Sequence, residues 1–487
     1  MPNRILLTAP ASGGGKTLIT CGILRALQKM GKKPVSFKCG PDYIDPMFHS
    51  RVLGTKSRNL DTFFTSDETV RRLLAENSAD CDIAVLEGVM GYYDGIAGTA
   101  IKASAYDVAR ATGTPAILIV NSRGASTSLI PLIRGFLQYQ NGDKYEISFD
   151  QRQDFHDKSK KSLSEEFPGL SNSRKTSGIC GIIFNRMSPM LYPRMKELTE
   201  KELPIPVVGF LPELSDCAIE SRHLGLVMPD EIAGLQEKID RLADRLLETL
   251  EWDVLLSIAA GAEEISAGSS GKHCETGKKK TPVRVAVASD EAFCFFYEDN
   301  FRLLKDLGAK LVFFSPLHDA ALPEHISGLL LFGGYPELHA EKLSENVSMR
   351  TSIRTSLAAG LPCMAECGGF LYLHEQMDSA AGTPYPMAGV IPGHARKTEK
   401  LNRFGYITLS GGTVFGKEVG AIPSHEFHYY DSDCCGDAFL AKKPESRRSW
   451  RCIHSTGSLF AGFPHMYYEA NPAVAEAFLD ACRNYSG

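Results

Sequence analysis

The sequence predicts an α/β protein with two domains, the first built on a doubly wound parallel sheet that carries a phosphate-binding loop. Short apolar runs alternate with helical segments in the first half of the chain, which is typical of a parallel sheet covered on both faces. The same alternation starts again after a linker-like segment. The length of 487 residues also exceeds what one hydrophobic core normally fills.

In the first half, each element follows from its apolar pattern. Residues 17–30 have helical spacing and are followed by Gly31, so we expect a helix that ends there. Short apolar runs predict buried strands at residues 4–8, 34–37, 83–86, 115–120, 179–184 and 207–210.

Two segments interrupt this alternation. Residues 141–177 contain "DKSKKSLSEE" and few apolar side chains, which indicates a polar surface insertion. Residues 259–281 are rich in Gly, Ser, Ala and Lys, which is the composition of a linker. We therefore expect a first domain over residues 1–258, a linker over 259–281 and a second domain over 282–487.

The second domain repeats the pattern. We expect a helix over residues 297–307, a last strand over 458–463 and a last helix formed by "NPAVAEAFLDAC". The other expected strands are residues 283–288, 310–314, 327–332 and 361–365.

Composition excludes several classes of protein. A net charge of -5 and a pI of about 6.3 argue against a nucleic-acid-binding protein, because phosphate contacts need a basic face. No apolar run approaches the roughly 20 residues of a membrane span, and no signal peptide precedes the glycine-rich run. The 13 cysteines lack zinc-type spacing, so we expect reduced thiols in a cytoplasmic protein.

A glycine-rich loop, "TAPASGGGKTLIT", follows the first expected strand and opens the first helix. Glycine backbone amides can wrap a phosphate, a lysine can reach the outer phosphates, and a threonine hydroxyl can bind Mg²⁺. Pro10 stands where the common pattern has glycine, and the alternative interpretation is a flexible turn. The expected ATP-binding residues are Ser12, Gly13, Gly14, Gly15, Lys16 and Thr17.

Two carboxylates could accompany Thr17 at a Mg²⁺ ion. Glu87 ends the apolar run "DIAVLE", and an acid at that place beside a phosphate loop is typical of a metal-associated carboxylate. Asp61, in "RNLDTFF", is the second candidate. Either residue could instead cap a helix.

A dense polar loop, "KCGPDYIDPMFH", follows the second expected strand. Its place at the carboxyl edge of the sheet is where ligands bind in doubly wound folds. The alternative is a simple Pro-Asp turn. We expect the loop to bind substrate through Lys38, Asp42, Tyr43, Asp45 and His49.

The second domain contains a candidate nucleophile in "GLPCMAECGGFLYL". Cys367 lies at an expected strand-to-helix turn, and the two glycines after it allow a sharp turn that exposes the thiol, whereas Cys363 lies within the strand and should be buried. Upstream, the amides of Gly333 and Gly334 could form an oxyanion hole.

A cysteine nucleophile needs a base, which we expect to be a histidine distant in sequence. His425, His428 and His465 are the candidates. His465 follows the last expected strand, which favours it over the other two.

These motifs together resemble the cobyrinate a,c-diamide synthase family of the cobalamin pathway over nearly the whole chain. The first half is similar to dethiobiotin synthetase in "SGGGKT", "KCGPDYIDP", "LEGVMGYYDG" and "ESRHLGL". The second half resembles a class I glutamine amidotransferase of the cobyrinate/cobyrate type in "GGYPEL", "AECGGFLYL" and "SHEFHYY".

The resemblance implies a function. Cys367, with His465 as base, would release ammonia from L-glutamine, and ATP with Mg²⁺ would activate the a and c carboxylates of a cobyrinate-type corrinoid as acyl phosphates. It leaves open a homodimer and two other substrates, hydrogenobyrinate and nickel sirohydrochlorin. A regulatory P-loop ATPase with an inactive amidotransferase domain is a further alternative.

The sequence also departs from the family pattern. Tyr467 stands where the usual run has a second histidine, and where ordinary class I amidotransferases have a glutamate two residues after the base. Cobyrinate-type relatives also lack that glutamate, so the resemblance implies that a Cys-His pair is enough for glutamine hydrolysis.

Overall fold

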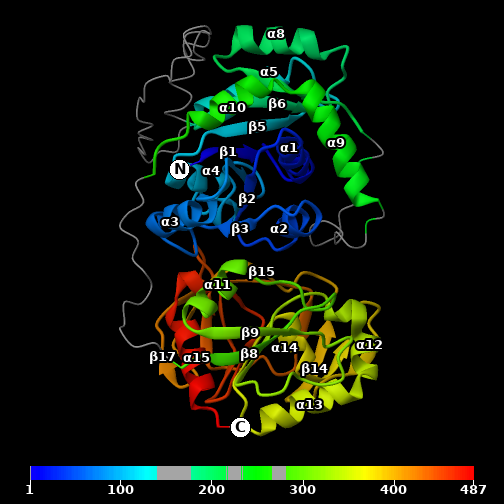
Figure 1. Ribbon diagram of the computed structural model, residues 1–487, viewed down its shortest axis with the longest axis vertical. Coiled ribbons are helices and arrows are strands. Elements are labelled where there is room, and N and C mark those ends of the chain that lie inside the picture. Colours follow the sequence, from blue (N-terminus) through cyan, green and yellow to red (C-terminus); the bar gives the residue numbers. More distant parts are fainter. Residues whose placement is uncertain are drawn as a thin grey trace. The chain divides into compact units, whose positions relative to one another are not determined.

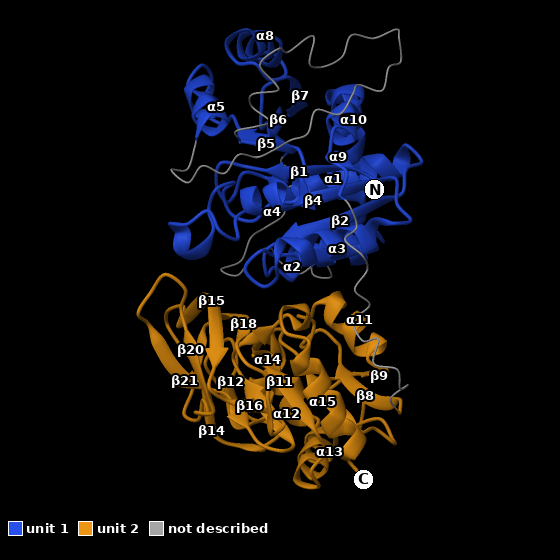
Figure 2. Cartoon of the chain, turned by 90° about the vertical axis from the view of Figure 1, so that its left-hand side faces the viewer, with its two compact units in different colours: residues 1–271 blue, residues 272–487 orange. Residues whose placement is uncertain are grey.

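The computed structural model describes residues 2–139, 177–214, 217, 232, 234–265 and 281–486. The chain forms two compact units, residues 1–271 and 272–487 (Figure 2). The division falls inside the segment that the sequence predicts as a linker. Residues 266–280 of that segment, nearly all of the predicted insertion and the "ESRHLGL" motif lie outside the described residues.

The first unit is built on a seven-stranded parallel sheet, which confirms the predicted fold class. The strand order is β3-β2-β4-β1-β5-β6-β7, and every neighbouring pair is parallel. The sequence did not predict β3, because three of its four residues are polar. The strands are β1 (Asn3–Thr8), β2 (Pro34–Cys39), β3 (Ser57–Leu60), β4 (Ile83–Glu87), β5 (Ala116–Asn121), β6 (Ile179–Asn185) and β7 (Val207–Leu211).

Helices cover both faces of this sheet (Figure 1). With the right-handed crossovers that parallel strands adopt as a rule, this strand order puts the helix after β1 on one face and the helices after β3, β4, β5 and β6 on the other. Among the described residues, no helix is both long and apolar enough to cross a membrane. The helices are α1 (Lys16–Lys29), α2 (Ile44–Met47), α3 (Asp67–Ser78), α4 (Ala105–Thr112), α5 (Leu129–Gln138), α8 (Tyr192–Glu202), α9 (Leu235–Thr249) and α10 (Trp252–Ala260).

The order of the strands places a ligand crevice between β1 and β4. These strands are neighbours in the sheet, and Leu7 pairs with Glu87. The connection after β1 leads to one face, whereas the connection after β4 leads to the other. Such a switch point opens a crevice at the carboxyl ends of the strands, and the glycine-rich loop begins there.

A buried arginine joins the beginning of the first unit to its end. Arg4 is 1% exposed. Its guanidinium donates hydrogen bonds to the carbonyl of Thr112, 2.9 Å away, and to the carbonyl of Glu263. Through this contact, Arg4 of β1 holds the chain at Glu263, three residues after the end of α10.

The second unit contains a six-stranded, mainly parallel sheet with the order β22-β23-β11-β10-β8-β9. Helices pack around it, as expected for the predicted α/β domain. The strands are β8 (Val283–Ala288), β9 (Ala309–Phe314), β10 (Gly328–Leu331), β11 (Cys363–Glu366), β22 (His454–Ser455) and β23 (Leu459–Gly462). The helices are α11 (Glu298–Asp306), α12 (Ala340–Glu345), α13 (Val347–Ala358), α14 (Gly368–Tyr372) and α15 (Ala473–Asn484).

Smaller sheets, made largely of antiparallel strands, occupy much of residues 374–466, and the sequence did not predict them. The expectation that residues 458–463 form the last strand was wrong. A two-residue strand, β24 (His465–Met466), follows and pairs with β18 (Ile422–His428). The remaining strands are β12 (His374–Asp378), β13 (Pro384–Pro386), β14 (Ile391–Lys397), β15 (Arg403–Ser410), β16 (Thr413–Val414), β17 (Lys417–Glu418), β19 (Tyr430–Ser432), β20 (Phe439–Lys442) and β21 (Ser449–Cys452).

Candidate active sites

The glycine-rich loop makes a tight turn between β1 and α1. Gly13 and Gly15 have φ angles of 74° and 91°, in the left-handed region that favours glycine. A Cβ on Gly15 would lie 2.2 Å from Nδ2 of Asn185, which in turn donates a hydrogen bond to the carbonyl of Gly14. Ser12 and Gly13 are exposed at the turn. The loop therefore offers backbone amides at the start of α1, where a phosphate can bind.

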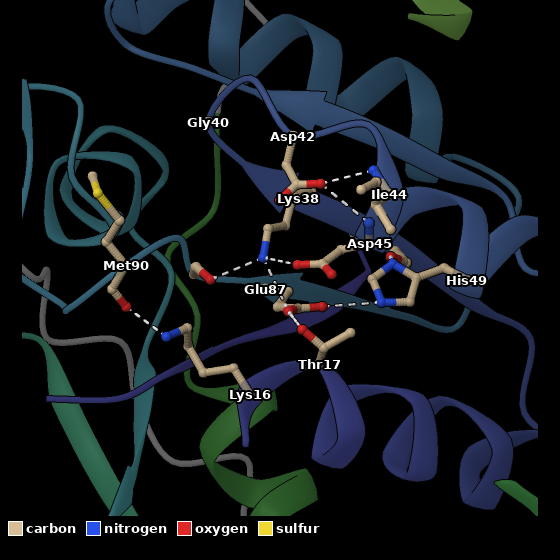
Figure 3. A network of polar contacts seen from close by, with 12 residues as sticks. Lys16, Thr17, Lys38, Gly40, Asp42, Ile44, Asp45, His49, Glu87 and Met90 are labelled. Carbon is tan, nitrogen blue, oxygen red and sulfur yellow. Dashed lines mark hydrogen bonds and ion pairs between the residues drawn. The ribbon is translucent and has the colours of Figure 1, made fainter. Parts of the chain in front are cut away.

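Lys16 lies across this loop. Its Nζ donates hydrogen bonds to the carbonyls of Ala11, at 3.2 Å, and Met90, at 2.5 Å (Figure 3). Burial, with a contribution from Lys38, lowers the pKa of Lys16 to about 8. The lysine is thus held at the crevice by neutral carbonyl oxygens, which a phosphate could replace as its partner.

Glu87 is contacted through both of its carboxylate oxygens, and its side chain is fully buried. Oε1 accepts hydrogen bonds from Thr17 at 2.6 Å and Lys38 at 3.0 Å, and Oε2 lies 3.0 Å from Nε2 of His49 (Figure 3). Burial alone would raise the pKa of Glu87, but Lys38, His49 and Thr17 hold it well below its ordinary value.

The Thr17 hydroxyl and the Glu87 carboxylate fit the oxygen ligands of a Mg²⁺ ion. Mg²⁺ beside a nucleotide usually takes one or two protein oxygens and completes its shell with phosphate and water. Among the described residues, no group of three or more His, Cys, Asp or Glu side chains is arranged to hold a metal ion. A site made by Thr17 and Glu87 therefore needs the phosphates of a nucleotide to be complete.

The polar loop after β2 is both a turn and part of this cluster. Oδ1 of Asp42 accepts hydrogen bonds from the amides of Ile44, at 2.8 Å, and Asp45, at 3.1 Å, which begins α2. Asp45 forms a buried ion pair with Lys38. Lys38 therefore joins the acidic loop to Glu87, while Tyr43 remains half-buried at the turn.

Two expected site residues have contacts that suggest other roles. The His49 ring is fully buried, with Nδ1 2.6 Å from Oγ of Ser36, so it lies behind Glu87 rather than at a surface open to substrate. Oδ1 of Asp61 accepts hydrogen bonds from the amides of Phe63, at 2.7 Å, and Phe64, at 3.2 Å. These contacts stabilise the turn that follows β3 and do not cap a helix, since the N-cap of α3 is Ser66, so the helix-cap alternative for Asp61 was wrong.

The second unit places Cys367 at a strained strand-to-helix turn. Its φ of 46° and ψ of -104° are unusual for a residue other than glycine. Its amide donates a hydrogen bond to the carbonyl of Gly462. A Cβ on Gly369 would lie 2.1 Å from the carbonyl oxygen of Leu331, so only glycine fits where α14 meets β10. This is the arrangement that presents a nucleophile at the tip of a sheet.

The Cys367 side chain is buried, so the expectation that the turn exposes the thiol was wrong. Burial raises its pKa well above the ordinary value, and the nearby Glu337 carboxylate raises it further. A hydrogen bond from the Gly368 amide acts in the opposite direction. Cys363 is fully buried within β11, as the sequence predicted.

The expected oxyanion-hole glycines lie between the nucleophile turn and His465. A Cβ on Gly333 would lie 2.6 Å from Cε1 of His465, and a Cβ on Gly368 would lie 3.0 Å from the amide nitrogen of Gly334. The first distance is shorter than real Cβ contacts allow, and the second is tighter than most of them. The loop after β10, the Cys367 turn and the His465 ring are thus packed around one place.

His465 and His425 lie together, whereas His428 faces other groups. His465 on β24 pairs with His425 on β18, and their rings stack with centroids 4.9 Å apart. Nδ1 of His428 lies 2.6 Å from the carbonyl oxygen of Tyr430, and its ring stacks on Phe463. The sequence did not foresee the His425–His465 stack, because it did not predict β24.

Burial shapes the pKa values of this histidine pair. It lowers the pKa of His465 well below the ordinary value, with further contributions from His425 and His428, and it lowers the pKa of His425 to about 3. Both imidazoles are therefore neutral in the resting site, as a base requires.

Comparisons with known proteins agree with the two sites. Residues 5–227 match the CobQ/CobB/MinD/ParA nucleotide binding domain, and residues 284–473 match the CobB/CobQ-like glutamine amidotransferase domain. The chain is 34% identical to a cobyrinate a,c-diamide synthase of Listeria innocua, covering 97% of this chain and 98% of that protein. The same identity relates it to the Salmonella typhimurium enzyme of that name, covering 99% and 98%.

The chain belongs to the cobyrinate a,c-diamide synthase family. A relative of the same name from Thermoplasma volcanium is 33% identical over 99% of this chain and 98% of that protein. Membership, together with the amidotransferase domain, makes the chain a glutamine-dependent ligase. Within this family member, Lys16 and Glu87 lie in the nucleotide binding domain. Cys367 and His465 lie in the amidotransferase domain.

Two residues near the sites were absent from the sequence prediction. Asn185, at the end of β6, braces the phosphate loop, and Glu366 places a carboxyl group 3.9 Å from Nδ1 of His465. A signal for Glu366 was its place directly before the nucleophile. Asn185 carried no such signal, because only the strand order brings it beside Gly15.

Proposed function

We propose that the chain uses ATP, Mg²⁺ and L-glutamine to convert the a and c carboxylates of cobyrinate into amides in cobalamin biosynthesis. The observation that carries the synthetase half is the position of Glu87, which contacts Thr17 of the phosphate loop and Lys38 of the acidic loop at once. The names and the length of the relatives support cobyrinate as the substrate.

In the first domain, over residues 1–258, an oxygen of the substrate carboxylate attacks the γ-phosphorus of ATP and the bond to the β-phosphate oxygen breaks. ADP leaves and an acyl phosphate forms. The loop from Ser12 to Gly15 binds the phosphates through its amides, and Lys16 offsets the charge of the transferred group. Ammonia then attacks the acyl carbon, the carbon–oxygen bond to phosphate breaks, and the nitrogen loses a proton.

Thr17 and Glu87 would hold the Mg²⁺ ion, which neutralises phosphate charge when it is bound. Lys38, Asp42, Tyr43 and Asp45 would face the substrate. The buried contacts of His49 favour a supporting role behind Glu87. Asp61 stays a second metal candidate, with its Oδ1 accepting two hydrogen bonds within its own turn.

In the second domain, over residues 282–487, Sγ of Cys367 attacks the side-chain amide carbon of glutamine. His465 takes the thiol proton and gives a proton to the departing ammonia, which leaves a thioester that water hydrolyses to glutamate. The amides of Gly333 and Gly334 would stabilise the oxyanion of the tetrahedral intermediate. Residues 259–281 would link the two domains.

Mass spectrometry of the reaction products tests the substrate. The full chain with ATP, Mg²⁺ and glutamine should replace two carboxylates of cobyrinate by amides. Parallel reactions with hydrogenobyrinate and nickel sirohydrochlorin test the two alternatives. Amidation of nickel sirohydrochlorin but not of cobyrinate would overturn the assignment, and ATP hydrolysis without glutamine hydrolysis would favour the regulatory ATPase.

Two further predictions concern the molecule in the cell. A cytoplasmic location follows from the reduced thiols that the sequence predicts, and fractionation checks it. A homodimer is tested by light scattering of the purified chain. Neither prediction affects the chemistry of the two sites.

A further inference from the structure

Tyr467 does not replace the glutamate that ordinary class I amidotransferases have at this place. Its hydroxyl donates a hydrogen bond to Oδ2 of Asp299 at 3.0 Å. Asp299 is the second residue of α11, and its Oδ1 lies 3.5 Å from Nε of Arg302. The tyrosine therefore contributes to packing between this turn and α11, and an acidic partner of His465 must come from elsewhere.

Glu366 lies where such a partner is needed. It is the last residue of β11 and is 2% exposed. Its Oε2 lies 3.9 Å from Nδ1 of His465 and accepts a hydrogen bond from the amide of Met466 at 3.4 Å. Its Oε1 is buried and has no hydrogen-bond partner among the described residues. The carboxyl group is therefore held against the imidazole by two neighbouring strand ends.

We propose that Glu366 is a positioning residue that orients His465 toward Cys367 and balances the imidazolium formed when the thiol proton moves to that ring. Because Glu366 faces Nδ1, the opposite nitrogen, Nε2, is the one directed to the thiol. A carboxylate holds the histidine base of serine hydrolases in the same manner. This inference rests on the proposed roles of Cys367 and His465.

The charges around the site show why a carboxylate is needed. Burial opposes an imidazolium at His465, and His425 and His428 oppose it further. Burial also opposes a thiolate at Cys367. Proton transfer between the two is therefore unfavourable unless a negative group faces the ring.

Glu366 can supply that charge only as a carboxylate. Burial raises its pKa to about 8, so the ionised form is itself costly without a cation beside it. An imidazolium at His465 stabilises the carboxylate, and the carboxylate stabilises the imidazolium. Three carboxyl groups raise the pKa of the Cys367 thiol, namely Glu337, Glu426 and Glu366 itself, and of these Glu366 is the one that lies beside Nδ1 of His465.

The test compares Glu366→Gln with the wild-type full chain. The variant should hydrolyse glutamine with a kcat roughly 100-fold lower and nearly the same KM, because the base is misdirected while glutamine contacts remain. Amidation supported by ammonium salts should be unchanged. Alkylation of Cys367 by iodoacetamide, measured against pH, should shift to higher pH, because the loss of the imidazolium beside the thiolate outweighs the removal of a carboxylate that by itself raises the thiol pKa.

A matched control is Glu426→Gln. Glu426 is also fully buried and also faces a histidine, with Oε2 3.5 Å from Nε2 of His428 and Oε1 accepting from Trp450. This variant should keep the wild-type kcat, and it should move the alkylation curve to lower pH, opposite to Glu366→Gln, because Glu426 raises the pKa of the thiol. Its behaviour separates a specific effect on His465 from the general cost of removing a buried carboxylate.

A wild-type kcat and an unshifted alkylation curve in Glu366→Gln would overturn the proposal. If that variant does not fold, Glu366→Asp retains the carboxylate and should keep the alkylation curve nearer to that of the wild type. If the alkylation curve of Glu366→Asp is shifted as far as that of Glu366→Gln, this result would also count against the proposal. Glutamine hydrolysis by Cys367→Ala would instead refute the proposed glutaminase itself.

Discussion

Single side chains in the first site have two functions at once, and Glu87 is the clearest case. Its carboxylate binds Thr17 and Lys38 through one oxygen and lies against His49 with the other. The same contacts that hold the cluster together also hold the group that would meet Mg²⁺. A substitution at this residue therefore tests both functions.

We expect Glu87→Gln to lower amidation by about 100-fold or more with either glutamine or ammonia, because an amide cannot balance Lys38 or bind Mg²⁺ as a carboxylate does. Glutamine hydrolysis by the second unit should continue. The control is Glu76→Gln, since Glu76 pairs with Arg72 one turn earlier on the exposed part of α3. Equal amidation rates for the Glu87 and Glu76 variants would remove Glu87 from the site.

Lys16 predicts a pH dependence for nucleotide binding. With its pKa lowered to about 8, it is a cation below that pH and loses its charge as the pH rises above it. ATP affinity measured by calorimetry should therefore fall above pH 8, by at most about tenfold per pH unit for one proton. Lys16→Ala should bind ATP weakly without this dependence, and identical curves for the two proteins would contradict the role of Lys16.

At the scale of elements, the turn between β11 and α14 depends on Gly369. An alanine there would collide with the backbone of Leu331, so we expect Gly369→Ala to destabilise the second unit by about 3 kcal/mol and to abolish glutamine hydrolysis. The chain has two tryptophans, and Trp450 alone lies in the second unit. In a Trp252→Phe background, Trp450 fluorescence during urea unfolding therefore measures that unit.

Gly457→Ala is the control for this prediction. Gly457 is exposed, and a Cβ there would meet nothing within 4 Å. Its unfolding midpoint should match that of the parent. If both alanine variants unfold at the same urea concentration, the close approach of α14 to β10 is not the reason that position 369 requires glycine.

The loop after β2 makes a second prediction at this scale. Asp42→Asn should keep the turn, because an asparagine oxygen can accept the same amide hydrogen bonds, yet it should impair amidation by removing a charge. Asp45→Asn should do the same by breaking the ion pair with Lys38. Both variants should still hydrolyse glutamine. Full amidation by both would make the loop a turn without a role in the site.

The elements show how far sequence reasoning reaches. Buried parallel strands were predictable because both of their faces are apolar, as in "AILIVN" of β5. The strands of the smaller sheets were not, because they mix polar with apolar residues, and in β18 several of the polar side chains are buried. The motifs located Lys16, Glu87 and Cys367, but the neighbours of His465 depend on β24, which is too short and polar to leave a pattern.

At the scale of the whole molecule, one chain contains two chemistries in two separate units. We expect Cys367→Ala to abolish amidation with glutamine but to keep near-wild-type rates with ammonium salts, because the synthetase unit is untouched. Comparing product formation with the two nitrogen sources checks this. Loss of the ammonia-driven reaction as well would show that the two activities are not divided in this way.

Arg4 has a consequence for the order in which the protein is made. It emerges from the ribosome among the first residues, but the carbonyl of Glu263 that accepts its hydrogen bond follows 259 residues later. Until then the buried guanidinium lacks one of its acceptors, so the nascent first unit stays open. We expect ribosome-bound chains exposed only to residue 258 to be cut readily by a protease, whereas chains exposed beyond Glu263 resist it.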